Sequence, residues 1–246
     1  VESPRRIATK QIGRIPSGSA SAVCAAKKSE SETWLGVAER GGLGSVFSVS
    51  LVAGVPQFTR RLSSLAISDC KMIEVGSEVL LLGKTTEGTL AYTLTKGSMA
   101  TATLVSRVPR NVFSSGNAPL PDGRIYFAGL GGTETQIYDP STRSFVVGPA
   151  LLTGRSSPLV QSLTNGDVLV LGGHDSKARP IAAPEIFVWR QSLNQAVPTT
   201  NPAPLERVGA AAARFFDGRV WIAGGTTNPQ TQIFGAQESS SRAPGF

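Results

Sequence analysis

The chain has 246 residues, of which 24 are basic, 17 are acidic and 40% are hydrophobic. This composition excludes wholesale disorder, and the lack of an apolar run of about 18 residues excludes a membrane-spanning helix. Glycine and proline, with 27 and 16 residues, make up about one residue in six. Residues that interrupt regular secondary structure, at this density, favour short strands joined by turns over a helical bundle.

The basic surplus lies at the N-terminal end. Residues 1–61 hold nine basic and four acidic residues, whereas the remainder holds fifteen and thirteen. Such a distribution favours a partner with an acidic surface, with RNA or another polyanion as the alternative. The first residue is Val1 rather than methionine, which suggests a processed protein (secreted, periplasmic or organellar) but leaves the compartment open.

Five short segments share one pattern, in which a polar residue precedes three or four apolar ones and usually a glycine. They are residues 32–37, 78–83, 124–129, 167–172 and 219–224. Their starts are 46, 46, 43 and 52 residues apart. Apolar runs this short, bounded by turn residues, predict strands that are buried on both faces. A period of this length indicates a repeat protein.

Each buried strand is the second of a predicted four-stranded unit. Asp122-Gly123, Asn165-Gly166 and Asp217-Gly218 predict two-residue hairpin turns in which both central residues take positive φ. The first strands are predicted at residues 20–26, 67–73, 112–118, 158–163 and 209–215. The third are predicted at 46–52, 90–95, 135–138, 185–189 and 231–234. The fourth are predicted at 57–61, 103–108, 144–147 and 195–199.

Four antiparallel strands per repeat predict an all-β chain that forms one β-propeller domain over residues 1–246. We expect five blades, in units of about 14–61, 62–108, 109–150, 151–200 and 201–236, with a flexible tail at 237–246. The fifth unit has three strands, and a spare strand at residues 7–12 would complete it and close the ring. The alternative is a fragment of a larger ring.

The two cysteines, Cys24 and Cys70, are 46 residues apart and occupy the same position in successive repeats. Residues at one repeat position point in the same direction, so we expect two buried thiols rather than a bridge.

The last three units resemble kelch repeats of the galactose oxidase central-domain superfamily. The residues that carry the resemblance lie within 107–236: the Pro121-Asp122-Gly123-Arg124 turn, Gly172-Gly173, Gly224-Gly225, and Tyr138-Asp139-Pro140. The resemblance implies four-stranded propeller blades and says little about function, because propellers host many activities. The copper chemistry of galactose oxidase does not carry over to a chain with one histidine and three tyrosines.

Three arginines stand at equivalent places, just before the first strand of a unit: Arg110, Arg155 and Arg207. In a propeller they would surround one mouth of the central channel and attract anions. The competing interpretation is that each arginine binds backbone carbonyls as a structural tie.

A long insertion follows Gly173 and carries His174, Asp175, Lys177 and Arg179. Loops on a rigid scaffold often contain binding residues, although a tolerated surface insertion without a function would have the same sequence pattern. His174 is the only histidine, so we expect neither a metal site nor a catalytic triad. We predict no catalytic residues and no cofactor.

The sequence therefore favours a non-catalytic scaffold that binds a protein partner, as a subunit of a larger assembly or alone. A glycan-binding, lectin-like propeller is the alternative, and RNA or polyanion binding is a further one. An enzyme that uses the central channel would need converging carboxylates or metal ligands, which the sequence offers poorly.

Overall fold

The computed structural model describes residues 20–29, 32–95, 102–109, 111–196, 208–225 and 232–234. These residues form an all-β structure of five antiparallel sheets, four with four strands and one with three. Two 3-10 turns, Val112–Ser114 and Trp189–Gln191, are the helical elements of the described part of the chain. None of its helices is long and apolar enough to cross a membrane. The chain divides into two compact units, which are described separately.

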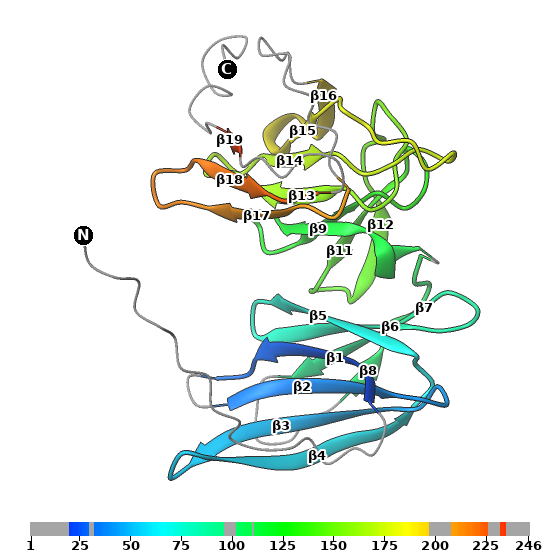
Figure 1. Ribbon diagram of the computed structural model, residues 1–246, viewed down its shortest axis with the longest axis vertical. Helices are drawn as coiled ribbons and strands as arrows, with labels where there is room; N and C mark the ends of the chain where they lie inside the picture. The colour runs from blue at the N-terminus through cyan, green and yellow to red at the C-terminus, as the bar shows by residue number, and fades with distance from the viewer. Residues whose placement is uncertain are drawn as a thin grey trace. The chain divides into compact units, whose positions relative to one another are not determined.

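Unit one comprises residues 1–86 and 90–104. Its first sheet has the order β1 (Ala20–Lys27), β2 (Glu32–Glu39), β3 (Gly44–Val52) and β4 (Val55–Leu65). Its second sheet has the order β5 (Asp69–Val75), β6 (Glu78–Lys84), β7 (Thr89–Thr95) and β8 (Ala102–Leu104). The first strands of the two sheets, β1 and β5, lie side by side (Figure 1).

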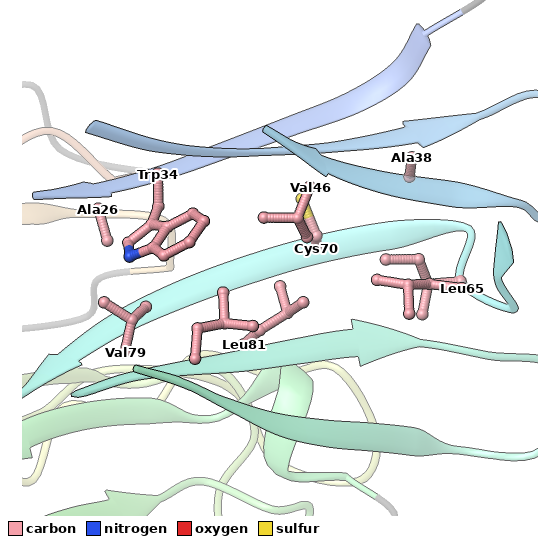
Figure 2. Packing of buried hydrophobic residues seen from close by; sticks show 10 residues of the cluster. Ala26, Trp34, Ala38, Val46, Leu65, Cys70, Val79 and Leu81 are labelled. Atoms are coloured by element: carbon pink, nitrogen blue, oxygen red, sulfur yellow. The ribbon is translucent and has the colours of Figure 1, made fainter. Parts of the chain in front are cut away.

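The two sheets of unit one pack face to face around a shared apolar core. Trp34 and Val46 from the first sheet meet Val79 and Leu81 from the second (Figure 2). All four side chains are fully buried. Trp34 is the largest of them and lies at the third position of its repeat segment, where the apolar pattern predicts a buried residue.

Unit two comprises residues 87–89 and 105–246. Its three sheets follow one another in chain order. The first holds β9 (Gly116–Pro119), β10 (Ile125–Ala128), β11 (Thr135–Asp139) and β12 (Ser144–Val147). The second holds β13 (Leu159–Ser162), β14 (Val168–Leu171), β15 (Glu185–Val188) and β16 (Leu193–Ala196). The third holds β17 (Ala211–Arg214), β18 (Val220–Ala223) and β19 (Gln232–Phe234).

Strand β14 shows why the second strand of a repeat is apolar throughout. Its Val168 and Val170 face the sheet before it, whereas Leu169 and Leu171 face the sheet after it. All four are buried, because successive side chains of a strand point to opposite faces and both faces are covered. The strands β9 and β13 are adjacent, and so are β13 and β17, as in unit one.

The hairpin turns of unit two differ from the predicted type. In the turn at Asp122-Gly123, the amide of Gly123 donates to Leu120 and the amide of Leu120 donates to Arg124. Only Gly123 has positive φ, at 87°. The loop therefore has three residues, with Pro121 in a tight turn followed by a glycine bulge. The pattern repeats at Gly166 and Gly218.

The prediction of two free cysteines is wrong, because Cys24 and Cys70 form a disulfide with a Cα–Cα distance of 5.7 Å. Both lie on first strands, and the adjacency of β1 and β5 brings equivalent repeat positions within reach of each other. Gly36, which pairs with Cys24, leaves room for the bond: a Cβ at Gly36 would lie 2.6 Å from the Cys24 sulfur and 3.2 Å from the Cys70 sulfur.

The expected closing strand at residues 7–12 and the tail at 237–246 lie outside the described residues. The sheet order confirms the all-β class and the four-stranded antiparallel repeat. The number of blades and the closure of a ring stay predictions.

Candidate functional site

Three loops of unit two pack against one another and form a surface that we call the loop platform: residues 129–134, 153–158 and 172–181. Four of its residues form a ladder of isolated bridges, in which Leu130 pairs with Ser156, Ser156 with His174, and His174 with Pro180. Ser156 and His174 exchange two backbone hydrogen bonds, of 2.8 and 3.0 Å. The ladder connects loops from two neighbouring sheets and so combines these loops into one surface.

Glycines permit this close packing of loops. Gly173 has φ of +80°, and a Cβ there would lie 2.5 Å from the carbonyl oxygen of Ser156. Gly129 has φ of +87° and would place a Cβ against the Pro158 ring. A side chain at either position would be strained in its backbone and would collide with its neighbours. The packing of these loops therefore explains the glycines at positions 129 and 173.

Arg155, in the second of these loops, lies inside the platform with no exposed surface. Its Nη2 is 2.6 Å from Oε1 of Glu185, which is also buried. The guanidinium donates further hydrogen bonds to the carbonyls of Thr153, Gly172 and Ala183, at 3.2, 3.2 and 2.9 Å. Burial lowers the pKa of Arg155 from its usual value, and the adjacent Glu185 opposes that shift.

Glu185 completes the anchor by fixing the start of the same loop. Its carboxylate accepts hydrogen bonds from the amides of Leu152 and Thr153, at 2.7 and 2.9 Å. One carboxylate thus binds two backbone amides and the arginine, which satisfies a charge that would otherwise be costly to bury. The pair holds the segment after β12 against the start of β15 and supports the platform from below.

The exposed part of the platform is a tight loop from Asp175 to Arg179. Oδ1 of Asp175 accepts hydrogen bonds from the amides of Lys177 and Arg179, at 2.8 and 2.9 Å. Oδ2 pairs with Nε and Nη2 of Arg179, both at 2.7 Å. These bonds, led by the Arg179 amide and its guanidinium, hold the pKa of Asp175 below its usual value. The loop is therefore ordered by its own side chains.

The loop presents two cationic side chains to solvent. Lys177 is exposed, and the Arg179 side chain has 70% relative exposure although it pairs with Asp175. His174 is half-buried, with Nδ1 at 3.1 Å from the carbonyl oxygen of Asp175, and its backbone belongs to the bridge ladder. This arrangement can bind carboxylates or carbonyls of a partner without rearranging its own backbone.

The structure brings together five of the seven residues that the sequence analysis singled out. His174, Asp175, Lys177 and Arg179 lie at the surface of the platform, and Arg155 lies inside it. Arg155 is fully buried, and its contacts match the alternative interpretation of a structural tie to backbone carbonyls. Arg110 and Arg207 lie outside the described residues, so the proposed arginine ring stays untested.

The sequence analysis missed Glu185. An acidic residue at the start of an apolar strand was a signal, since a buried carboxylate requires a partner. The partner lies thirty residues earlier in the chain. Among the described residues, no group of three or more histidine, cysteine or carboxylate side chains is placed to hold a metal ion. Neither a protein family nor a curated protein matches the chain.

Proposed function

We propose that the protein is a non-catalytic binding module, a kelch-like β-propeller that presents the loop platform to a protein partner. The observation that carries the proposal is the Asp175–Arg179 loop. It is ordered by internal hydrogen bonds, it stands on the buried Arg155–Glu185 pair, and it exposes Lys177 and Arg179. A preformed surface loses little conformational entropy on binding, and its cations suit an acidic partner surface.

The propeller part of the proposal is supported by the repeat itself. Within each unit, successive sheets pack face to face, and their first strands lie side by side. The third sheet of unit two has three described strands, and residues 7–12 would supply a fourth. A five-bladed ring closed in this way would leave no open sheet face between neighbouring blades.

The disulfide supports a location for this module. Structural disulfides form and persist in oxidising compartments and are rare in the reducing cytosol. The bond between Cys24 and Cys70 therefore favours a secreted, periplasmic or other oxidising environment.

The experiment compares the wild type and three variants of the immobilised protein as baits for a partner in extracts of its own source. Lys177→Glu reverses a charge without touching the bonds that order the loop. Arg179→Ala removes both a cation and the side-chain bond to Asp175. Arg190→Glu, an exposed position in the turn at Trp189–Gln191, is the matched control.

A partner retained by the wild type and by Arg190→Glu, but lost with Lys177→Glu, supports the platform as the binding surface. Equal retention by the wild type and all three variants contradicts it. Retention of nucleic acid that disappears with rising salt would favour the polyanion alternative, because phosphate contacts release counterions. Elution by a free sugar would favour a lectin instead.

A further inference from the structure

The outer strand of the first sheet is unlike the outer strands of the other sheets. Strand β4 has 11 residues, whereas β8 has 3 and β12 and β16 have 4 each. Within the described part of the chain, no strand pairs with its outer edge. Natural proteins usually keep exposed edge strands short, because unpaired backbone groups invite another strand to bind. A long open edge therefore needs an explanation.

The register of β4 shows which backbone groups face outward. The β3–β4 turn has two residues, Ala53 and Gly54, both with positive φ, and the flanking Val52 and Val55 are paired. Residues flanking such a turn form a hydrogen-bonded pair, and bonded and non-bonded pairs then alternate along an antiparallel ladder. The backbone groups of residues 56, 58 and 60 consequently point away from β3. The amides of Phe58 and Arg60 are the outward donors, because proline has none.

Two cations flank this edge, one on each face of the sheet. The Arg60 guanidinium lies 5.4 Å from the centre of the Phe47 ring, and Nε of Arg61 donates to Oγ of Ser48 at 2.9 Å. Phe47 and Ser48 are consecutive in β3, so they and the two arginines lie on opposite faces. Strand β4 contains no acidic residue. The edge is therefore positively charged on both sides.

The end of the same hairpin is apolar and exposed. Leu51, Val52 and Val55 have relative exposures of 62, 58 and 54%. They flank Ala53 and Gly54, so the tip of the hairpin exposes apolar side chains on both faces of the sheet, five residues along β4 from Arg60. Exposed apolar surface that adjoins charge is typical of an interaction site.

We propose that the outer edge of β4 binds an extended peptide segment of another protein, which adds to the first sheet as a fifth strand. The segment carries two adjacent acidic residues. Adjacent residues of a strand point to opposite faces, so one carboxylate meets Arg60 and the next meets Arg61. An apolar residue farther along the segment packs against Val55 at the tip of the hairpin. Backbone hydrogen bonds supply affinity in this mode, and the alternate side chains supply specificity.

A second copy of the chain fits this edge less well. The middle of the 11-residue strand is Arg60, so a symmetric antiparallel pairing over its full length would place Arg60 opposite its own copy. Like charges directly opposite each other destabilise a strand pair. An acidic segment from another protein is attracted by the same arginine charges. The edge lies in unit one and the loop platform in unit two, so either proposal can fail without the other.

The test measures the affinity of a fluorescein-labelled synthetic peptide with two central glutamates flanked by valine and threonine. The same peptide with a central proline is the ligand control. Arg60→Ala removes one charge and keeps the backbone amide, whereas Arg60→Pro also removes the outward donor; proline is tolerated at the outward positions of edge strands. Arg190→Glu is the protein control, and circular dichroism confirms that each variant is folded.

We expect saturable binding by the wild type and by Arg190→Glu. Arg60→Ala should weaken it about tenfold, as the loss of one close charge pair does, and Arg60→Pro should abolish it. The proline-containing peptide should not bind. Absence of binding by the folded wild type overturns the proposal, and so does equal affinity of Arg60→Pro and the wild type. In either case, the arginines would serve only to protect the edge against aggregation. A dimer in sedimentation that Arg60→Pro abolishes would overturn it in favour of self-association.

Discussion

Cys24 and Cys70 join the first strands of two successive sheets, although they occupy the same position in successive repeats. Where first strands lie side by side, equivalent residues of neighbouring repeats are close together in space. The Cα atoms of Cys24 and Cys70 are 5.7 Å apart. That spacing lies within the range of ordinary disulfides. The bond ties the two sheets of unit one together at the edge where they are closest.

Replacing both cysteines by alanine should lower the free energy of unfolding of unit one. The disulfide closes a loop of 46 residues, and the chain-entropy argument gives a loss of about 4 kcal/mol. Urea unfolding, followed with and without dithiothreitol, measures the effect. Reductant should destabilise the wild type by a similar amount and leave the double variant unchanged. A wild type that is insensitive to reductant after complete reduction would contradict the prediction.

Replacing Glu185 by alanine should destabilise unit two strongly. The substitution leaves the Arg155 charge buried and two amides without their acceptor, and breaking a buried ion pair in this way costs about 3–5 kcal/mol. Denaturant unfolding measures the loss. Arg219→Ala is the matched control, since it breaks an exposed pair with Asp217 and should hardly move the midpoint. Similar midpoints for the two variants would show that the buried pair does not anchor the platform.

Gly173, which precedes His174 of the bridge ladder, gives a prediction that separates steric crowding from backbone strain. Gly173→Ala introduces both, because its φ is +80° and its Cβ would lie 2.5 Å from the Ser156 carbonyl oxygen. Gly123→Ala introduces strain alone, because its φ is +87° and no atom lies within 4 Å of the added carbon. Thermal unfolding should show a loss of about 1–2 kcal/mol for Gly123→Ala and a larger loss for Gly173→Ala. Equal losses would mean that the loops move apart without cost.

The strands could be predicted from sequence because each leaves a local signal. After an initial acidic residue, the segments 78–83 and 167–172 are apolar or glycine at every position because both faces of each strand are covered, and the turn residues beside them mark their ends. The type of hairpin turn was harder to predict from the sequence. Asp122-Gly123 is typical of a two-residue turn, but the loop begins one residue earlier, at Pro121, and only Gly123 takes positive φ. The same three-residue loop forms at Gly166 and Gly218 without a proline.

The interactions that define the site are not local, and this is why sequence reasoning reached them only in part. The loop from Asp175 to Arg179 was visible in the sequence as part of a long insertion after Gly173. The burial of Arg155 depends on Glu185, at the start of strand β15, and nothing in the chain between them indicates the pairing. The disulfide likewise depends on how two sheets are packed. Periodicity predicts which residues a strand buries, but not which strand lies against it.

The final prediction concerns the acid behaviour of the platform loop. The pKa of Asp175 is held below its ordinary value of 3.8, first by the Arg179 amide and then by the Arg179 guanidinium. The folded state therefore keeps this carboxylate ionised more readily than the unfolded chain does. Its contribution to stability is present above the ordinary pKa and is lost as the pH falls through the lowered value. The loop should be fully ordered at neutral pH.

Carbon-detected NMR of the Asp175 carboxyl group, recorded over an acid titration, measures this pKa directly. Arg179→Ala removes the guanidinium and keeps the amide, so the pKa of Asp175 should rise only part of the way to 3.8. Asp217 is the internal control, because its pKa is lowered in the same manner by Arg219 and should not respond to a change at Arg179. An ordinary pKa for Asp175 in the wild type would contradict the ordered loop, and with it the preformed surface on which the proposed binding function depends.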